Sequence, residues 1–377
     1  MKIHMKVLHF SKYYEPFIGG VEQVARDCAA AMEGYEQKIF CFNHEKGDAV
    51  GNVDGVEVIR AGCFAKVASQ SLSFSYGKLL KKTFREFEPD VVIFHYPNPF
   101  GAHYLRKVLK KRPSCKLVLW WHLDITRQKV LGKLFEGQTK WLLRRADRVV
   151  ATSPNYIEGS RHLSSVREKC TVIPCCANTA RICADEAART RAEEIRAEHA
   201  GKIICFAVGR HVPYKGMEYL IRAGKLLDER FFVAVGGAGP LTEQLRELAG
   251  EDKKISLLGR VSDEDLKAWL LACDIFCFPS VTKNEAFGIA LAEAMAFGKP
   301  AVTFTIEGSG VNYVSLDGVT GIECPNKDVG AYAAAIRMLA ENEPLRRRYG
   351  EAAAQRAQEY FTYERFAQNV NRMISEL

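Results

Sequence analysis

The chain has 377 residues, of which 47% are hydrophobic, and its formal net charge is +8. One hydrophobic core rarely organises so many residues, so the length predicts two domains. The sequence has no apolar stretch long enough to cross a bilayer, and its N-terminal run, MKVLHF, reads as a strand rather than a signal peptide. We therefore expect a cytoplasmic protein.

Basic residues gather in the first half of the chain and suit an anionic partner. A solvated helical face also explains each cluster by itself. Nucleic acid is disfavoured because no aromatic-interleaved basic motif or zinc finger accompanies the clusters. An anionic membrane surface remains as a partner. The clusters are Lys78, Lys81, Lys82 and Arg85; Arg106, Lys107, Lys110, Lys111 and Arg112; and Arg127, Lys129, Lys133, Lys140, Arg144, Arg145 and Arg148.

The twelve cysteines include no CxxC pair. Cys175 and Cys176 are adjacent and could be grouped with Cys170 and Cys183, but no spacing matches a known zinc pattern. We therefore expect no metal site.

Short strand-like runs alternate with helical patterns, which indicates parallel α/β units. The expected strands are 6–10, 37–42, 56–60, 90–95, 116–121, 147–153 and 170–174, then 202–209, 231–237, 254–259, 274–280 and 299–304. The pattern restarts after a segment rich in Ala, Glu and Arg at 184–200, an exposed helix or linker. Two doubly wound domains are therefore predicted, over 1–180 and 201–360, with a linker at 181–200 and a C-terminal helix at 361–377 that packs back on the first domain.

Four motifs in the second half place polar or flexible residues at expected strand ends, where anions bind in such folds. VGRHVPYKG supplies Arg210 and Lys215, two cations that could hold a diphosphate. GGAGP supplies Gly237, whose backbone could approach a ligand. LLGRVSDEDL exposes backbone at Arg260 and Val261, while its acids suit a helix start capped by Ser262 rather than a metal site.

The fourth motif is EAFGIALAEAMAFGKP, over 285–300. Glu285 and Glu293 lie eight positions apart, roughly 80° past two helical turns, so both could border one helix face, with Glu285 at or just before the first turn and Glu293 inside the apolar run. A carboxylate in so apolar a run is costly unless it is paired. A helix dipole and a salt bridge explain the two acids as well as a ligand does.

In the first half, YEPFIGGVEQVA leads from a strand to a helix through Gly19 and Gly20, without the GxGxxG spacing of a dehydrogenase. WWHLD ends a strand with His122, a candidate site residue that Asp124 could orient. His95 ends the preceding strand and is a weaker candidate.

Taken together and in this order, these motifs resemble the retaining glycosyltransferases of family 4. The resemblance runs over nearly the whole chain. It implies the GT-B fold, with two facing Rossmann-like domains and an active site in the cleft between them. Glu285 and Glu293 match the family's E-x7-E motif. One departure is IPCCANTARI, which stands where many members have a stretch such as IPNGVD.

The resemblance also implies the roles of residues at a nucleotide-sugar site. Glu293 would bind the ribose, Glu285 the sugar, Arg210 and Lys215 the diphosphate, and His122 would lie near the anomeric carbon. The implied catalytic residues are His122, Glu285, Arg210 and Lys215. The implied donor-binding residues are Gly19, Gly20, Arg210, Lys215, Gly237, Arg260, Val261, Glu285, Ala286, Phe287, Gly288, Ile289 and Glu293.

By this resemblance the reaction needs neither metal nor cofactor, because fixed cations and helix-end amides stabilise the leaving diphosphate. The chain looks similar to bacterial transferases that add mannose from GDP-mannose to a polyprenyl-diphosphate-linked or oligosaccharide acceptor in polysaccharide assembly. Such an acceptor would bring the basic N-terminal domain to the inner face of the plasma membrane. Alternatives are a UDP-sugar-dependent transferase with a soluble acceptor, a GT-B sugar-nucleotide epimerase, and a nucleic-acid-binding protein, which leaves both glutamates without a role.

Overall fold

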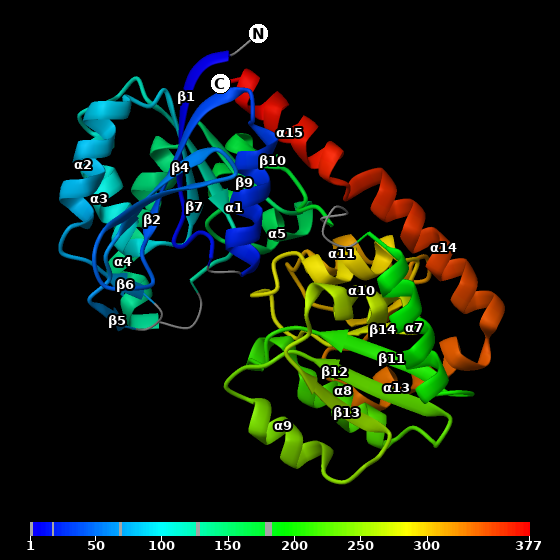
Figure 1. The fold of residues 1–377 in the computed structure, drawn as a ribbon. Helices are drawn as coiled ribbons and strands as arrows, with labels where there is room; N and C mark the ends of the chain where they lie inside the picture. Colours follow the sequence, from blue (N-terminus) through cyan, green and yellow to red (C-terminus); the bar gives the residue numbers. More distant parts are fainter. Residues whose placement is uncertain (1–2, 17–18, 68–69, 126–128, 178–182) are drawn as a thin grey trace. The chain divides into compact units, whose positions relative to one another are not determined.

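The computed structural model describes residues 3–16, 19–67, 70–125, 129–177 and 183–377 (Figure 1). They divide into two compact units. Unit 1 comprises Met1–Thr152, Ser160–Ile173 and Phe366–Leu377, and unit 2 comprises Ser153–Gly159 and Pro174–Arg365. Three parts of the motifs above lie outside the described residues: 17–18 of the glycine turn, Arg127 of the basic stretch, and 178–182 of the IPCCANTARI loop.

Unit 1 is built on an eight-stranded sheet with the order β10-β9-β8-β7-β1-β2-β4-β3. All neighbours in it are parallel except β3 and β4. The strands expected in this half are confirmed, and three that were not expected are β3 and the small hairpin of β5 and β6. The strands are β1 (Ile3–Phe10), β2 (Tyr35–Phe42), β3 (Ala49–Val53), β4 (Val56–Ala61), β5 (Ala65–Val67), β6 (Gln70–Leu72), β7 (Val91–Tyr96), β8 (Lys116–Trp121), β9 (Arg148–Ala151) and β10 (Cys170–Val172).

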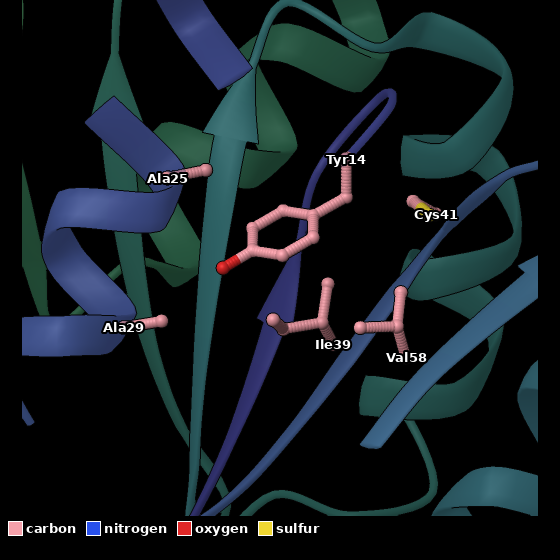
Figure 2. Packing of buried hydrophobic residues seen from close by; sticks show 6 residues of the cluster. All are labelled: Tyr14, Ala25, Ala29, Ile39, Cys41 and Val58. Carbon is pink, nitrogen blue, oxygen red and sulfur yellow. The ribbon is translucent and has the colours of Figure 1, made fainter. Parts of the chain in front are cut away.

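The helices of unit 1 follow its strands, as parallel pairing requires. They are α1 (Gly20–Ala31), α2 (Tyr76–Phe87), α3 (Pro99–Leu109) and α4 (Lys129–Arg145), with a 3₁₀ turn at Ser164–Lys169. Figure 2 shows Tyr14, just after β1, packed against Ala25 and Ala29 of α1 and against Ile39 and Val58 of neighbouring strands. This buried cluster fixes the segment that leads from β1 to the glycine turn.

The last helix, α15 (Tyr363–Ser375), belongs to unit 1 from Phe366 onward. The Asn371 side-chain amide donates to the Ala31 carbonyl at the end of α1, at 2.8 Å. The Phe366 ring lies 5.7 Å from the ring of Trp120, which is fully buried on β8. The C-terminal segment is therefore part of the unit 1 core.

Unit 2 has a six-stranded, parallel sheet with the order β13-β12-β11-β14-β15-β16. All of these strands were expected except β16. The strands are β11 (Ile203–Val208), β12 (Phe231–Gly236), β13 (Ile255–Gly259), β14 (Ile275–Phe278), β15 (Ala301–Phe304) and β16 (Gly321–Cys324). The helices are α5 (Pro154–Gly159), α7 (Glu186–Glu198), α8 (Met217–Lys225), α9 (Thr242–Ala249), α10 (Asp263–Ala272), α11 (Ile289–Ala296), α12 (Val311–Val314), α13 (Val329–Glu341) and α14 (Glu343–Tyr360).

Helix α7 covers most of the segment that was expected to be an exposed helix or linker. It is part of unit 2, where Ala188, Ala192 and Ile195 are buried and the helix packs on α10. The Arg196 guanidinium makes two hydrogen bonds of 2.9 Å to the Asp274 carboxylate next to β14. Small alanines form the buried stripe, so the apolar signal of this helix is weak in the sequence.

In the part of the chain that the structure describes, no helix has both the length and the apolar character to cross a membrane.

The contact between Phe366 of α15 and Trp120 predicts a loss of stability when the Phe366 ring is removed. Phe366→Ala should lower the free energy of unfolding by about 3 kcal/mol, because it leaves a cavity against Trp120. Urea unfolding followed by tryptophan fluorescence measures the change. Gln368→Ala, at an exposed position of the same helix, is the control, and equal effects of the two variants would contradict this role of α15.

Candidate active site

The candidate residues of unit 2 lie where its strand order reverses. Strands β11 and β14 are neighbours in the sheet. The sheet continues from β11 through β12 and β13 on one side, and from β14 through β15 and β16 on the other. Ligands of open α/β sheets bind at the carboxyl ends of the strands at such a switch point. Arg210 and Lys215 follow β11 and Glu285 follows β14, so the fold brings these three together from two segments.

The centre of this site is an ion pair between Lys215 and Glu285. Their Nζ and Oε2 atoms are 2.5 Å apart, and both side chains are largely buried. The Ser280 hydroxyl donates to the same Oε2 at 3.0 Å. Burial alone would lower the pKa of Lys215, but the negative charge of Glu285 and its hydrogen bond outweigh burial, and the net pKa is raised. Lys215 therefore stays positively charged at neutral pH.

Close backbone contacts hold the two charged residues in place. Gly216 has φ 62° and lies so close to β14's end that an added Cβ would be 2.1 Å from the Pro279 carbonyl oxygen. The Val281 amide donates to the Tyr214 carbonyl at 2.9 Å. Only glycine fits such an approach, so the turn after Lys215 is fixed against the segment that leads to Glu285.

The Glu285 loop is held from its other side by residues 309–310. The Ser309 hydroxyl donates to the Glu285 carbonyl at 2.5 Å, and the Gly310 amide donates to the Ala286 carbonyl at 3.1 Å. Phe287 is 3% exposed, and its ring packs edge-on against Phe361 at 5.5 Å. The loop that carries the first glutamate is thus anchored on both sides.

The two glutamates do not share a helix, so the expectation that both border one helix face is wrong, whereas the expectation that Glu285 stands at or just before the first turn is confirmed. Helix α11 begins at Ile289, after Gly288 with φ 99°, and Glu285 lies in the preceding loop. Glu293 lies within α11 and is 3% exposed. Glu285 is held in place by its loop and by its contact with Lys215, whereas Glu293 is held in place by helix α11.

The ends of neighbouring strands in unit 2 contact each other. Gly237 has φ 122°, and an added Cβ would lie 1.9 Å from the Gly209 carbonyl oxygen, directly before Arg210. Its amide donates to the Gly259 carbonyl at 2.6 Å. His211 is fully buried, and its Nδ1 lies 2.9 Å from the Thr242 hydroxyl. The ends of β11, β12 and β13 therefore form one connected edge.

Two arginines on this edge are exposed, in contrast to Lys215. Arg210 follows β11, and its positive charge opposes that of Lys215. Arg260 follows β13, and the next residue, Val261, packs near Gly236. The acids after Val261 begin α10, whose first turn is capped by the Ser262 hydroxyl accepting from the Asp265 amide at 3.0 Å, as predicted.

Unit 1 has its own switch point, between β1 and β7. Gly19 and Gly20 lead from β1 into α1, and Gly19, which precedes the helix, has an extended backbone. His122 directly follows β8, and its amide donates to the Tyr96 carbonyl at 3.0 Å. The three unit 1 candidates thus lie at the carboxyl edge of their sheet.

His122 is the end of a row of buried histidines on one face of this sheet. Its Nε2 lies 2.9 Å from Nδ1 of His95, so one of the two nitrogens carries the shared proton. His9 pairs in register with Ile93, two residues before His95, so the side chains of His9 and His95 share a face. The Nε2 atom of His9 lies 2.8 Å from the Gln37 side-chain oxygen on the next strand.

All three imidazoles are neutral at physiological pH. Burial lowers the pKa of His122 from 6.5 to about 3. Burial also lowers the pKa of His9 to about 4, although its hydrogen bond to Gln37 opposes the shift. Burial, with the neighbouring His122 and His9, holds the pKa of His95 well below its ordinary value. His122 can therefore exchange hydrogen bonds with a ligand but brings no charge to it.

Asp124 has partners other than His122. Its Oδ1 atom accepts hydrogen bonds from the Trp121 indole at 3.1 Å and from the Ser160 hydroxyl at 2.8 Å. The side-chain contact that orients His122 comes from His95, the weaker candidate of the sequence analysis.

Among the described residues, no three or more His, Cys, Asp or Glu side chains are grouped as metal ligands. Cys175 and Cys176 are both buried, at 4% and 2% exposure.

Sequence reasoning missed His9, Gln37, Ser280 and Ser309. A signal existed for Ser280, which follows β14 at the edge where the other candidates lie. The row of buried histidines that includes His9 could not be predicted from the sequence, because it depends on the register of strands far apart in the chain.

Comparison with known proteins finds a family match over most of the chain. A family model described as Glycosyltransferase Family 4 matches residues 18–181, and one described as Glycosyl transferases group 1 matches residues 189–356. The chain is 35% identical over 370 residues to the D-rhamnosyltransferase WbpZ of Pseudomonas aeruginosa, covering 95% of this chain and 92% of the relative. It is 31% identical over 363 residues to the O-antigen chain mannosyltransferase C of Escherichia coli, covering 95% of each.

Solved structures share the fold at low sequence identity. Anabaena HepE in complex with UDP and glucose has a TM-score of 0.80 and 19% identity, over 99% of this chain and 100% of that chain. Sucrose-phosphate synthase from Thermosynechococcus elongatus has a TM-score of 0.79 and 19% identity, over 99% of both chains. The fold is thus GT-B, with two Rossmann-like α/β domains, as predicted.

The close approach of Gly216 to Pro279 predicts that one added methyl group at residue 216 strongly lowers the stability of the protein. Gly216→Ala should lower the free energy of unfolding by about 3 kcal/mol, because it adds a clash with Pro279 to a left-handed backbone. Gly201→Ala, at φ 73° with no atom within 4 Å of the added Cβ, should cost only about 1 kcal/mol. Chemical denaturation measures both, and equal losses would show that the Pro279 contact is unimportant.

The buried histidines predict a loss of stability in mild acid. Their rings take up a proton below pH 6.5 in the unfolded chain but not in the folded one, so the free energy of unfolding falls as the pH drops below 6.5. From pH 7 to pH 5 each ring should account for about 2 kcal/mol.

His9→Gln should remove about 2 kcal/mol of this pH-dependent loss, as measured by urea unfolding at the two pH values. His44→Gln, at an exposed histidine of the same unit, is the control. An unchanged loss in His9→Gln would mean that His9 is not held neutral.

Proposed function

Because the chain belongs to the retaining glycosyltransferases of family 4, we propose that it transfers mannose from GDP-mannose to a lipid-linked acceptor in polysaccharide assembly. The observation that carries the proposal is the Lys215–Glu285 ion pair at the switch point of unit 2, with Arg210 beside it. Two cations at strand ends suit a diphosphate, and a fixed carboxylate beside them suits sugar hydroxyls.

The chemistry follows from where charge develops. When the bond between the sugar and the diphosphate breaks, negative charge builds on the leaving diphosphate. Lys215 is held charged by Glu285, and Arg210 is exposed to solvent beside it, so both can stabilise that charge without a metal ion. A ligand phosphate would compete with Glu285 for the Lys215 ammonium and leave the carboxylate to accept hydrogen bonds from the sugar.

The other candidate residues complete the proposed donor site. Glu293 is proposed to bind the ribose hydroxyls, and the backbone at Gly237, Arg260 and Val261 to bind the base and phosphates. From unit 1, we propose that residues 19–20 bind the diphosphate and that the neutral His122 hydrogen-bonds the sugar. The leaving phosphate would then help to deprotonate the acceptor on the same face of the sugar, which retains the configuration.

The names of these two relatives support a donor sugar of the manno configuration. D-Rhamnose is 6-deoxy-D-mannose, so the rhamnosyltransferase and the mannosyltransferase both act on a sugar of the manno configuration. The two sugars differ at the C6 hydroxyl. A site that hydrogen-bonds this hydroxyl rejects the deoxy analogue strongly, whereas an apolar site does not.

The acceptor is proposed to be a polyprenyl-diphosphate-linked glycan, presented at the cytoplasmic face of the membrane. The exposed basic residues of α2, which are Lys78, Lys81, Lys82 and Arg85, would favour approach of unit 1 to an anionic surface.

A panel of nucleotides tests the donor. GDP, GDP-mannose and GDP-D-rhamnose, but not the UDP or ADP series, should raise the melting temperature, with about 2.7 kcal/mol of stabilisation at 100 times the dissociation constant. Arg210→Ala and Glu293→Gln should reduce the shift. Arg210→Ala is preferred to Lys215→Ala, because loss of Lys215 leaves a buried, unpaired Glu285.

Lys225→Ala, at an exposed cation on α8, is the matched control and should keep the full shift. A shift with UDP instead of GDP would favour the UDP-sugar alternative. A shift that survives both site variants would refute the proposed donor site. Release of the sugar or an epimer without any acceptor would favour the epimerase.

A further inference from the structure

Unit 1 has an open pocket of about 630 Å³ at the carboxyl edge of its sheet, away from the histidine row. Its lining includes Tyr13, which follows β1, Lys46, which follows β2, and Phe64 and Lys66, which follow β4. These strands are neighbours in the sheet. The pocket thus lies at the edge where ligands of such sheets bind, and none of its residues belongs to the proposed donor site.

Two lysines, Lys46 and Lys66, line the pocket, and a third, Lys12, lies beside its Tyr13 ring. The Lys66 ammonium lies 5.0 Å and the Lys12 ammonium 5.5 Å from the centre of the Tyr13 ring. The ring itself is buried, and its hydroxyl is hydrogen-bonded to the Ser71 hydroxyl of β6. Lys46 is exposed on the pocket wall. Lys66 and Lys12 therefore lie near the buried Tyr13 ring, and Lys46 adds a further positive charge to the pocket wall.

One carboxylate also lines this pocket. Glu45 lies with an oxygen 3.6 Å from Nε2 of His44, and its side chain is 75% exposed. Lys46 and Lys66 outnumber this carboxylate in the lining, so the pocket favours an anion.

The rim of the pocket is apolar and exposed. Phe64 and Phe74 stack on each other with their ring centres 4.0 Å apart and their planes 6° from parallel. Phe64 is 47% exposed, Phe74 87%, and Val67 of the β5–β6 hairpin 58%. The stacked rings of Phe64 and Phe74 form an exposed apolar surface beside the pocket lysines, of the kind that marks an interaction site.

A cationic lining with an apolar rim suits an anionic amphiphile rather than a soluble sugar or a nucleotide. We propose, on the premise of the function proposed above, that this pocket binds the diphosphate of the lipid-linked acceptor. Lys46, Lys66 and Lys12 contact the phosphates, while Phe64, Phe74 and Val67 contact the lipid chain where it leaves the membrane. Aromatic rings and lysine stems are suited to that boundary between apolar and polar layers.

Binding to vesicles tests the pocket with the full chain. Phosphatidylcholine vesicles that contain a long-chain polyprenyl diphosphate are compared with vesicles that contain phosphatidylglycerol at the same total charge, and binding is measured by co-sedimentation. The wild type should prefer the diphosphate vesicles, and soluble pyrophosphate should compete. Lys46→Ala combined with Lys66→Ala should weaken binding by about 30-fold, the effect of two lysines near an anionic surface.

Phe64→Ser combined with Phe74→Ser tests the rim and should also weaken binding to diphosphate vesicles, whereas Lys225→Ala of unit 2 should leave it unchanged. All substituted side chains are exposed, so folding should be retained. Equal binding to both vesicle types would overturn the proposal. So would a loss of binding in Lys81→Ala with Lys82→Ala of α2 and none in the pocket variants, which would indicate general attraction to the membrane.

The nucleotide panel, run on the same preparations, separates the two proposals. Stabilisation by a nucleotide without pocket-dependent vesicle binding would refute the pocket and leave the transferase function standing. Pocket-dependent binding without any stabilisation by a nucleotide would refute the function and leave an anionic lipid site.

Discussion

A buried ion pair between Lys215 and Glu285 is the constraint on which the rest of unit 2 depends. Two charges this far from water are tolerated only when each compensates the other. The pair can form because Gly216 lets one backbone segment lie against the Pro279 carbonyl, and because residues 309–310 hold the Glu285 loop from behind. The sheet order, the glycine turn and the charge pair are thus parts of one arrangement.

The two units contribute different physical properties. Unit 2 carries the fixed cations, with Lys215 buried and Arg210 and Arg260 exposed. At its histidine row, unit 1 offers neutral hydrogen-bonding groups, because burial keeps the imidazoles of His9, His95 and His122 uncharged. The cations of unit 2 therefore attract anions, whereas a neutral imidazole such as that of His122 can distinguish ligands only by the direction and length of its hydrogen bonds.

The sequence predicted the parts that depend on local pattern. Apolar runs located the main strands, and strand ends followed by glycine and basic residues located Arg210, Lys215 and Gly237. The missed strands β3, β5, β6 and β16 are short or carry glycine and polar residues, so their apolar signal is weak.

What the sequence could not provide was register and tertiary contact. The histidine row needs the pairing of β1, β7 and β8, and the contact of Gly216 with Pro279 joins segments more than sixty residues apart. The helical spacing of Glu285 and Glu293 was misleading for a related reason, since it extended helical geometry to Glu285, which lies before the helix. A loop held by distant residues instead places the first glutamate, and no local periodicity records that.

The return of α15 to unit 1 has a consequence for how the protein can be divided. Neither unit is a continuous stretch of chain, because unit 1 takes its last piece from Phe366–Leu377 and unit 2 takes a short piece from Ser153–Gly159. A fragment that stops after the N-terminal sheet would leave Trp120 uncovered where Phe366 normally packs. During synthesis, the core of unit 1 is therefore complete only after Phe366–Leu377 have been added.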